Sequence, residues 1–357
     1  MPSFFTPYDQ QCLDRRRRLH VIDWACGDGP LNIVAMGDAS SETSAPTRDG
    51  LVAAIGNFDG VHLGHVKVIA AAVDHAHEVG MTPAVITFDP HPRRFFQPDH
   101  DGFALTDEDD KLTFLAKLGV RIVIRLTFDE ALRSTSADHF VTHILAGLNI
   151  KHLFAGSDFA FGKGRAGSID MIAQMGQAQG LTAHPVDLKP SQEGLQSGQD
   201  SGEIISSSLI RSAISEGDVK AAARLLGRPF IISGTVIKGD QNGRTIGFPT
   251  ANVQLGQMQL PAFGVYTIAA RLADQGGKIY GGVANLGVRP TATDRGVLLE
   301  ANLFDYDGDL YGQRLNVFLL DFIRPERAFD DFDALKKQIA LDAQTARQFH
   351  RDGTRNL

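Results

Sequence analysis

The stretch LVAAIGNFDGVHLGH, residues 51–65, decides the fold of the first half of this chain. Its opening residues are apolar and predict a buried strand over residues 51–58, which ends at a glycine-containing loop. The next residues predict a helix over residues 63–77. A helix N-terminus carries free N–H groups and the positive end of the helix dipole. This junction therefore predicts an anion-binding edge of a parallel α/β sheet.

The rest of the first half repeats this order of strand and helix. Strands are expected over residues 82–88, 121–128 and 151–156, and helices over residues 110–118 and 137–148. This alternation predicts an α/β fold, with a parallel sheet covered by helices on both faces. Residues 207–226 predict two further short helices, with Gly217 between them and Gly227 as the stop.

After Arg228 the pattern changes to short strands separated by Gly, Asp and Pro turns. This pattern predicts an all-β antiparallel sheet or small barrel, closed by an amphipathic helix over residues 329–349. The expected strands cover residues 230–237, 265–272, 279–285, 298–304 and 315–322.

Three segments follow from this division. Residues 1–50 form an N-terminal extension, irregular and expected to be poorly ordered or accessory, and residues 51–228 and 229–357 form two domains. Because residues 1–45 carry none of the motifs described below, we expect them to be dispensable for chemistry.

Composition limits the class of protein. The 357 residues suit two domains, and the net charge of -7 argues against a nucleic-acid partner. The two cysteines, Cys12 and Cys26, exclude a disulfide framework and a thiolate zinc site, and they fit a reducing compartment. No apolar run is long enough to cross a bilayer, and no signal-peptide core is present. We expect a cytoplasmic protein with small-molecule ligands and no membrane partner, and the sequence leaves a homo-oligomer open.

His62 and His65 carry the chemistry of the first motif. They are three residues apart on the first helical turn and therefore share a face, and Gly64 leaves room for a ligand beside the backbone. Two imidazole donors beside a helix N-terminus can stabilise charge on a transferring phosphoryl group. The alternatives are a zinc pair, which has no third ligand at a recognisable spacing, and two incidental surface histidines.

Residues 205–211, ISSSLIR, form a second anion-binding candidate. The hydroxyls of Ser206, Ser207 and Ser208 precede a helix, and Arg211 lies one turn inside it. The hydroxyls could be helix caps alone. Together with the guanidinium group, they also form a cradle suited to a pyrophosphate leaving group.

These two motifs resemble those of the nucleotidyltransferase superfamily, in which an HxGH motif and a later Ser/Arg motif flank the phosphates of ATP. Residues 56–65, together with FDPHP at 88–92 and residues 158–167, are similar to the FMN adenylyltransferase module of the bacterial bifunctional riboflavin kinase/FAD synthetase family. The resemblance implies a Rossmann-like domain with His62 and His65 as catalytic residues. It implies ATP binding by Gly56, Phe58, Asp59, Gly64, Ser206, Ser207, Ser208 and Arg211, and flavin binding by Phe88, Pro90, His91, Asp158, Phe159 and Phe161.

The second half carries its own candidate site. Residues 234–239 and 243–252 are rich in glycine, which lets backbone N–H groups approach phosphate closely. Thr250 and Asn252 offer oxygen ligands for a Mg²⁺ ion shared with ATP. Glu300 is the acidic residue of an apolar strand, either satisfied at a sheet edge or acting as the base for an attacking hydroxyl.

This half resembles riboflavin kinase, on residues 234–239, 243–252, 264–266, 285–291 and 308–312 together with Pro261 and Glu300. The resemblance implies Glu300 as the catalytic base and Thr250 and Asn252 as the Mg²⁺ and ATP residues. It also implies phosphate binding by Gly239, Gly243, Arg244 and Gly247, and flavin binding by Arg289. One departure is Asn302, where the family commonly has His.

The two resemblances imply an enzyme with ATP as co-substrate at two separate sites. One site would phosphorylate riboflavin to FMN, and the other would adenylylate FMN to FAD with release of pyrophosphate, both with Mg²⁺. Three alternatives remain open. They are an enzyme with one active half, a flavin-sensing protein without activity, and an aminoacyl-tRNA synthetase fragment. The last would need a lysine-containing loop where Leu209 and Ile210 stand.

Overall fold

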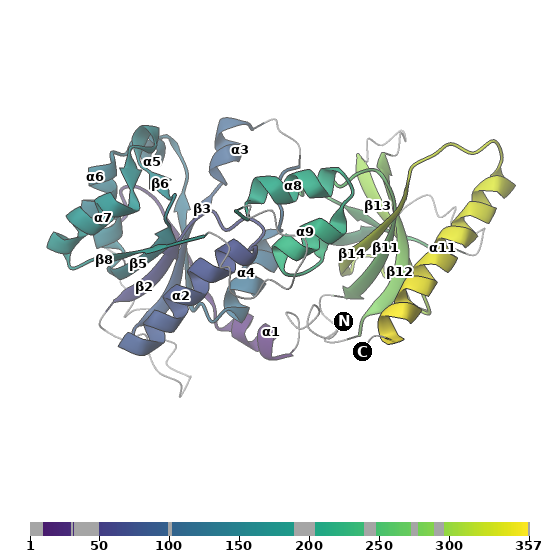
Figure 1. Cartoon of the computed structure of the whole chain (residues 1–357), viewed down its shortest axis with the longest axis horizontal. Coiled ribbons are helices and arrows are strands. Elements are labelled where there is room, and N and C mark those ends of the chain that lie inside the picture. The colour runs from purple at the N-terminus through teal and green to yellow at the C-terminus, as the bar shows by residue number, and fades with distance from the viewer. Residues whose placement is uncertain are drawn as a thin grey trace. The chain divides into compact units, whose positions relative to one another are not determined.

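A computed structural model of the chain describes residues 10–29, 31, 50–98, 102–188, 204–238, 248–272, 278–288 and 296–355. The chain divides into two compact units (Figure 1). The sheet unit contains Asp14–His100 and Leu112–Ile205. The barrel unit contains Met1–Leu13, Asp101–Lys111 and Ser206–Leu357.

The sheet unit is built on a six-stranded sheet in the order β1-β4-β3-β2-β5-β8, with every neighbouring pair parallel. The parallel sheet predicted for the first half is therefore confirmed. Its central strand β2 is buried along its whole length, as its apolar run predicts. The strands are β1 (His20–Trp24), β2 (Leu51–Ile55), β3 (Thr82–Asp89), β4 (Ile122–Thr127), β5 (Ile150–Gly156) and β8 (Thr182–Val186), and a separate hairpin joins β6 (Ala160–Phe161) to β7 (Gly167–Ser168).

Helices pack against the sheet from both faces. Alternate residues of β2, among them Leu51 and Ile55, belong to a core that also contains Ile144 and Ile172. The residues between them in β2 are equally buried, because the long helix α2 packs against β2, β3 and β5. The helices are α1 (Gln10–Arg17), α2 (Leu63–Val79), α3 (Pro92–Phe96), α4 (Glu108–Lys117), α5 (Glu130–Ser134), α6 (Ala137–His139), the π-helix η3 (Phe140–Leu145), α7 (Ile169–Gly176) and the short 3-10 turns Lys163–Arg165 and Gln177–Gln179.

The N-terminal extension contributes a strand, which the sequence did not predict. β1 pairs in parallel with β4 at the edge of the sheet, and the Trp24 side chain is only 7% exposed. Arg125 of β4 also holds Asp23 through two hydrogen bonds of 2.7 and 2.9 Å. A five-residue strand that follows a run of arginines is too short to show a period, which is why this region looked irregular.

Deleting residues 1–45 tests how much this strand contributes. We expect the sheet unit to lose about 3 kcal/mol of unfolding free energy, because removing one buried Trp side chain alone costs about that much. The thermal midpoint should fall by roughly 6–12 °C. The rate of FAD formation by the folded protein should change only a few-fold, since no motif residue is removed.

The matched control for this deletion is Asp23→Ala, which removes only a partly exposed ion pair with Arg125 and should cost less than about 1 kcal/mol. An unchanged midpoint in the deleted chain would show that β1 adds no stability. Loss of FAD formation in a folded deletion variant would show that the extension shapes the first site.

The barrel unit contains a closed six-stranded barrel in the order β10-β13-β12-β11-β14-β9, with antiparallel pairing throughout. The small antiparallel barrel predicted for the second half is confirmed, with β10 as a strand that the sequence analysis had not included. The strands are β9 (Phe230–Ile237), β10 (Ala251–Gln254), β11 (Gly264–Leu272), β12 (Tyr280–Val288), β13 (Val297–Leu303) and β14 (Arg314–Pro325).

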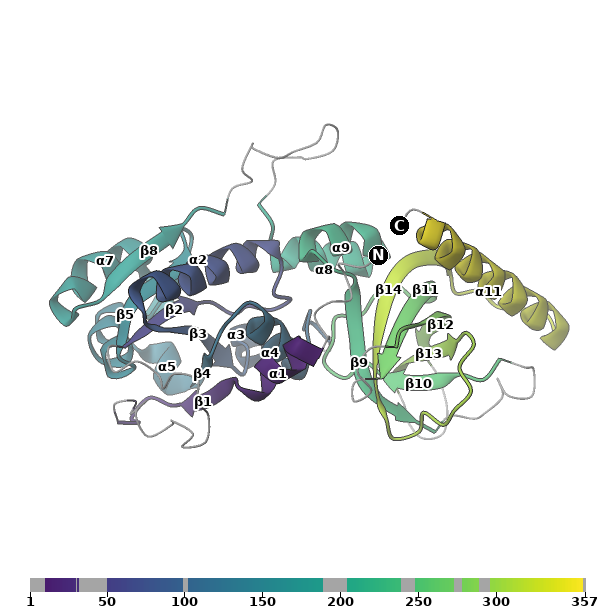
Figure 2. The same cartoon turned by 90° about the horizontal axis from the view of Figure 1, so that it is seen from below.

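The helices of the barrel unit also agree with prediction. α8 (Ser207–Ser215) and α9 (Val219–Leu226) are separated at Gly217, and Gly227 ends α9 in the left-handed conformation, with φ of 71°. The closing helix α11 (Phe332–Arg355) runs along the outside of the barrel (Figure 2). A Cβ atom at Gly281 of β12 would lie 2.8 Å from the His350 ring, so glycine allows α11 to approach the barrel closely.

A segment from within the first half of the sequence belongs to the barrel unit. Asp110 is buried, and its carboxylate accepts hydrogen bonds from Ser233 of β9 and from Asn316 of β14, the latter at 3.2 Å. Asp107 likewise accepts from Arg314 at 2.7 Å. The barrel unit is therefore assembled from more of the sequence than residues 229–357.

Candidate active sites

The motifs of the first half lie at one edge of the sheet. Strands β3, β2 and β5 are neighbours in the sheet, and each leads at its carboxyl end into one of the predicted loops. The chain passes from β2 to β3 on one side, whereas β5 lies on the other side of β2. This edge is therefore a switch point in strand order, the place where parallel α/β sheets bind their ligands.

The loop after β2 is built around Phe58. This side chain is only 1% exposed, and Phe58 and Val61 adopt positive φ values of 50° and 37°. A Cβ atom at Gly56 would lie 3.1 Å from the Phe58 ring, so glycine favours the close packing of this ring under the loop. The Thr87 hydroxyl donates to the Asn57 carbonyl at 3.1 Å and ties the loop to β3. The buried Phe58 side chain thus shapes this loop from beneath.

His62 and His65 lie together at the N-terminus of α2. His62 is the N-cap residue, and its Nδ1 accepts a hydrogen bond from the His65 backbone N–H at 3.3 Å. Because Nδ1 is the acceptor, the proton of a neutral His62 ring lies on Nε2. The two rings stack, with centroids 3.5 Å apart. A Cβ atom at Gly64 would lie 3.2 Å from the His62 ring, so glycine here makes room for the imidazole itself.

The loop after β3 contains the predicted FDPHP motif, residues 88–92. Phe88 is half-buried against the sheet core, and its ring packs edge-on to Phe128 at 6.1 Å. Pro90 follows a cis peptide bond from Asp89. His91 is the N-cap of α3, where its Nδ1 accepts from the Arg93 backbone N–H at 3.1 Å. A helix start therefore follows this strand as well.

The loop after β5 contains the predicted motif of residues 158–167. Asp158 is exposed, whereas the rings of Phe159 and Phe161 stack with centroids 5.7 Å apart. Phe161 is buried and also packs on Phe140 of the π-helix. Gly162 has a φ of 72° and lies against the backbone of Ala137, so this turn requires glycine.

The serine and arginine motif begins α8 in the barrel unit. Ser206 is the N-cap, and its hydroxyl accepts a hydrogen bond from the Leu209 backbone N–H at 3.3 Å. This serine therefore caps the helix, as one of the two interpretations of the sequence expected. Ser207 and Ser208 are the first helical residues. Arg211 donates from Nε to the Phe103 carbonyl at 2.8 Å, and its guanidinium lies over the Phe103 ring. This partner, which is distant in the chain, was not predicted from the sequence.

The barrel brings the predicted kinase residues together through strand register. Asn252 of β10 and Asn285 of β12 are the direct partners of Glu300 in β13. Directly opposite residues in antiparallel strands have Cβ atoms about 4.5–5.5 Å apart on the same face of the sheet. Thr250 is half-buried just before β10. Asn252 and Glu300 therefore lie side by side on one face of the barrel sheet.

Two contacts around Glu300 were not predicted. Asn302, on the same face of β13 two residues later, donates to the Pro249 carbonyl at 2.7 Å and so holds the segment that leads to Thr250. Asn285 donates to Glu326 at 3.3 Å. The sequence had already singled out Asn302 beside Glu300, but not its contact with the Pro249 carbonyl. The predicted residues Gly239, Gly243, Arg244, Gly247 and Arg289 lie outside the described residues.

Comparison with known proteins matches each part of the chain to a known family. The family model for FAD synthetase matches residues 44–198, and the model for riboflavin kinase matches residues 226–350. The bifunctional riboflavin kinase/FMN adenylyltransferase of Pseudomonas fluorescens is 41% identical over 304 residues, which cover 85% of this chain and 94% of that protein. The chain belongs to this bifunctional family. Its order of an α/β domain and a β-barrel domain, and its place among enzymes of FAD biosynthesis, confirm the predicted fold class and function.

Other members and solved structures show the same similarity. The Escherichia coli K12 protein of the family is 38% identical over 307 residues, covering 86% of this chain and 95% of that one. A crystal structure described as a macrolide-efflux protein from Streptococcus pneumoniae is 29% identical, with a TM-score of 0.74, covering 91% of this chain and 99% of its own. Across the residues that the structure describes, no helix combines the length and the apolar character needed to cross a bilayer.

Proposed function

We propose that the barrel transfers the γ-phosphoryl group of ATP to the 5′-hydroxyl of riboflavin, with Glu300 as the base. The observation that carries this proposal is the register that places Asn252 and Asn285 on either side of Glu300. A hydroxyl nucleophile must lose its proton as it attacks, and a carboxylate fixed between two neighbouring strands is a suitable acceptor. The product of this step is FMN.

The residues beside Glu300 fit a magnesium ion bound together with ATP. Thr250 and Asn252 offer the oxygen ligands that Mg²⁺ prefers, and this ion takes few protein ligands because it keeps water molecules. When bound, the ion would neutralise phosphate charge. The glycine-rich segment is proposed to surround the phosphates through Gly239, Gly243, Arg244 and Gly247, and Arg289 is proposed to contact the flavin.

The sheet unit is proposed to provide the adenylyltransferase chemistry. The Nε2–H of His62 and the ring of His65 would donate to phosphate oxygens at the N-terminus of α2, where the helix dipole also favours negative charge. These donors would stabilise the charge that develops when the FMN phosphate attacks ATP. Gly56, Asp59 and Gly64 are proposed to contact ATP from the same loop, with Phe58 holding that loop in shape.

The remaining predicted residues have proposed roles around these phosphates. Arg211 would hold the leaving pyrophosphate, because a guanidinium fork matches two phosphate oxygens at once. Ser206, Ser207 and Ser208 would add hydroxyl and backbone donors at the start of α8. The flavin is proposed to lie against the loops after β3 and β5, contacted by Phe88, Pro90, His91, Asp158, Phe159 and Phe161.

The division of labour along the chain is part of this proposal. Residues 51–228 are proposed as the FMN adenylyltransferase domain and residues 229–357 as the riboflavin kinase domain, with residues 1–50 as an accessory extension. Small molecules are the proposed partners, and a cytoplasmic location and a homo-oligomer remain expectations from the sequence.

Incubation of the purified full chain with riboflavin and Mg-ATP tests the whole assignment. We expect FMN to appear first and FAD second when the flavins are separated by chromatography, because the product of the barrel is the substrate of the sheet unit. Flavin binding without turnover would instead favour a sensor. FMN without FAD would show that only one half is active.

A further inference from the structure

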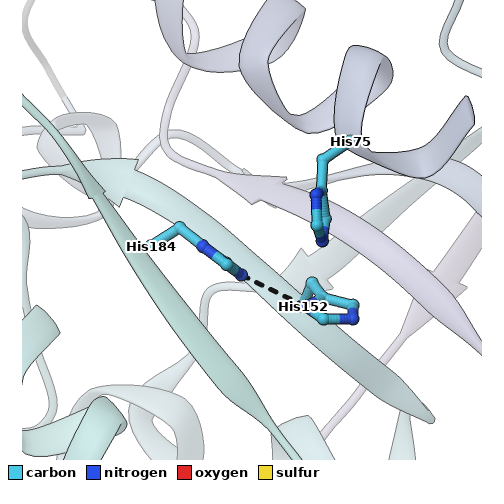
Figure 3. Close-up of side chains that lie close together, drawn as sticks. All are labelled: His75, His152 and His184. Carbon is cyan, nitrogen blue, oxygen red and sulfur yellow. Dashed lines mark hydrogen bonds between the residues drawn. The ribbon is translucent and has the colours of Figure 1, made fainter. Parts of the chain in front are cut away.

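Three histidines gather on the sheet unit at a place that none of the predicted motifs uses. His75 lies on α2, His152 on β5 and His184 on β8, and one ring nitrogen from each lies within 4.8 Å of the others. Figure 3 shows the His75 ring descending from its helix toward the other two rings, which come from neighbouring strands. The fold therefore brings together three imidazoles that are far apart in the sequence.

The cluster is remote from the loops assigned to adenylyl transfer. Ten residues of α2 separate His65 from His75, which corresponds to about 15 Å along a helix. His152 is the third residue of β5, four residues before the carboxyl end of the strand, or about 13 Å. The cluster is therefore not an extension of the HxGH site.

Hydrogen bonding within the cluster leaves one nitrogen unsatisfied. Nδ1 of His152 and Nε2 of His184 are 3.1 Å apart and share one hydrogen bond. Nδ1 of His75 faces a carboxylate oxygen of Glu78 at 3.4 Å, whereas its Nε2 is buried and has no hydrogen-bond partner within the described part of the chain. A buried polar atom without a partner is rare, and an absent ion or water molecule is one of its ordinary causes.

The surroundings of His152 and His184 favour the neutral form that binds metals. The His184 ring stacks on Phe154 at 4.4 Å, and His75 packs on the same phenylalanine at 5.5 Å. Burial lowers the pKa of both His152 and His184 below the ordinary histidine value, and the neighbouring imidazoles lower the pKa of each further. Neutral imidazole, with a lone pair on one nitrogen, is the species that coordinates a metal ion.

We propose that His75, His152 and His184 form a binding site for one divalent transition-metal ion of the class that prefers imidazole, represented by Zn²⁺. In a tetrahedral site with Zn–N bonds of about 2.0–2.1 Å, the ligand nitrogens are separated by roughly 3.3 Å. The 3.1 Å contact between His152 and His184 already has this spacing. The nitrogen of the third ring lies within 4.8 Å of the other two, which exceeds this spacing by about 1.5 Å at most, and the fourth position would be left for water.

Glu78 completes the arrangement as an outer partner. A carboxylate that accepts from Nδ1–H of a histidine fixes the ring so that Nε2 presents its lone pair to a metal, a common feature of protein metal sites. The contact of 3.4 Å between Glu78 and Nδ1 of His75 therefore supports the same ligand atom that is left unsatisfied. The ion would connect α2, which carries His62 and His65, to the edge strand β8, and its role would be structural.

Zinc titration of the full chain tests this site. After chelator treatment and without Mg²⁺ or nucleotide, calorimetry with Zn²⁺ should show one saturable site per chain. The thermal midpoint should rise by roughly 5–11 °C when free Zn²⁺ reaches roughly one hundred times the dissociation constant. His184→Ala should weaken Zn²⁺ binding at least about 100-fold, because one of three protein ligands is lost. FAD formation from FMN with Mg-ATP should remain within a few-fold of the parent.

Two controls make the result specific. His77→Ala removes an exposed histidine two residues from His75 and should leave Zn²⁺ binding unchanged. His75→Gln, at a helix position, gives a second ligand variant in case His184→Ala fails to fold. Co²⁺ bound by the parent should show the intense visible bands of a tetrahedral site, and these bands should be absent from both ligand variants.

Several outcomes would overturn the proposal. Zn²⁺ binding that persists unchanged in folded His184→Ala or His75→Gln would place the ion elsewhere. Zn²⁺ binding lost instead when His62 and His65 are replaced would assign it to the HxGH turn. An octahedral Co²⁺ spectrum would contradict the tetrahedral site, and no saturable binding in the parent would show that the three histidines only pack against one another.

Discussion

Glu300→Gln is expected to nearly abolish conversion of riboflavin to FMN, with a loss of about 10²- to 10⁴-fold in rate. The amide has nearly the shape of the carboxylate but cannot accept the hydroxyl proton. The register with Asn252 and Asn285 should survive, because it is set by backbone hydrogen bonds of the barrel. Circular dichroism and the unfolding midpoint can confirm that the variant remains folded.

The same variant supplied with FMN separates the two chemistries. FMN already carries an anionic phosphate and needs no base for its attack, so FAD should form at close to the parent rate. Asp321→Asn is the matched control, because it removes a carboxylate from another strand of the same barrel, where its partner is Lys220. It should change FMN formation only a few-fold.

A folded Glu300→Gln variant that makes FMN normally would remove Glu300 from the mechanism. Equal slowing of both reactions would show that the two sites are not independent.

The strands that carry the motifs could be predicted because their signal is local. β2 is a continuous apolar run that ends at a glycine-containing loop, and helix periodicity identifies α2. β8 was missed because Pro185 interrupts its sequence, TAHPV. Proline cannot donate to the strand ladder, but it is tolerated here because β8 lies at the edge of the sheet.

Features that join distant parts of the chain could not be predicted. Asp110 lies on a helix expected to belong to the first domain, and nothing near it in sequence indicates its partners Ser233 and Asn316. The contact from Arg211 to Phe103 also spans more than 100 residues. The histidines of the proposed metal site come from three separate elements. Metal sites with regular spacing are visible in a sequence, whereas this one depends on the order of strands in the sheet.

The candidate site residues could be predicted only in part, because some depend on local spacing and others on strand register. The spacing of His62 and His65 fixes their common face on one helical turn, so their proximity was predictable. Whether Asn252 faces Glu300 depended on barrel register, and a shift of one residue would have turned one of them to the other face. Gly64 was predicted to leave room for a ligand, and in the structure it also accommodates the His62 ring.

Replacement of both HxGH histidines should do the reverse of Glu300→Gln, so that FMN accumulates and FAD does not form. The structure also gives His62 a capping role, since its Nδ1 accepts the His65 backbone N–H. Loss of a helix cap costs about 1 kcal/mol and would confuse the result. His62→Asn combined with His65→Ala avoids this difficulty, because asparagine is among the best N-cap residues. The variant removes both imidazole rings while α2 keeps its cap.

Removing a donor that stabilises transition-state charge typically costs 10²- to 10³-fold in rate, so we expect FAD formation from FMN and Mg-ATP to fall by at least about 100-fold in the double variant. Riboflavin phosphorylation should stay within a few-fold of the parent, because no barrel residue changes. His77→Ala, near the opposite end of the same helix, is the matched control and should leave both rates unchanged. If the double variant is folded and still makes FAD at the parent rate, the two imidazoles do not act on the phosphates. If instead it loses FMN formation as well, the effect is structural, and adenylyl transfer must be assigned to other groups at this edge of the sheet.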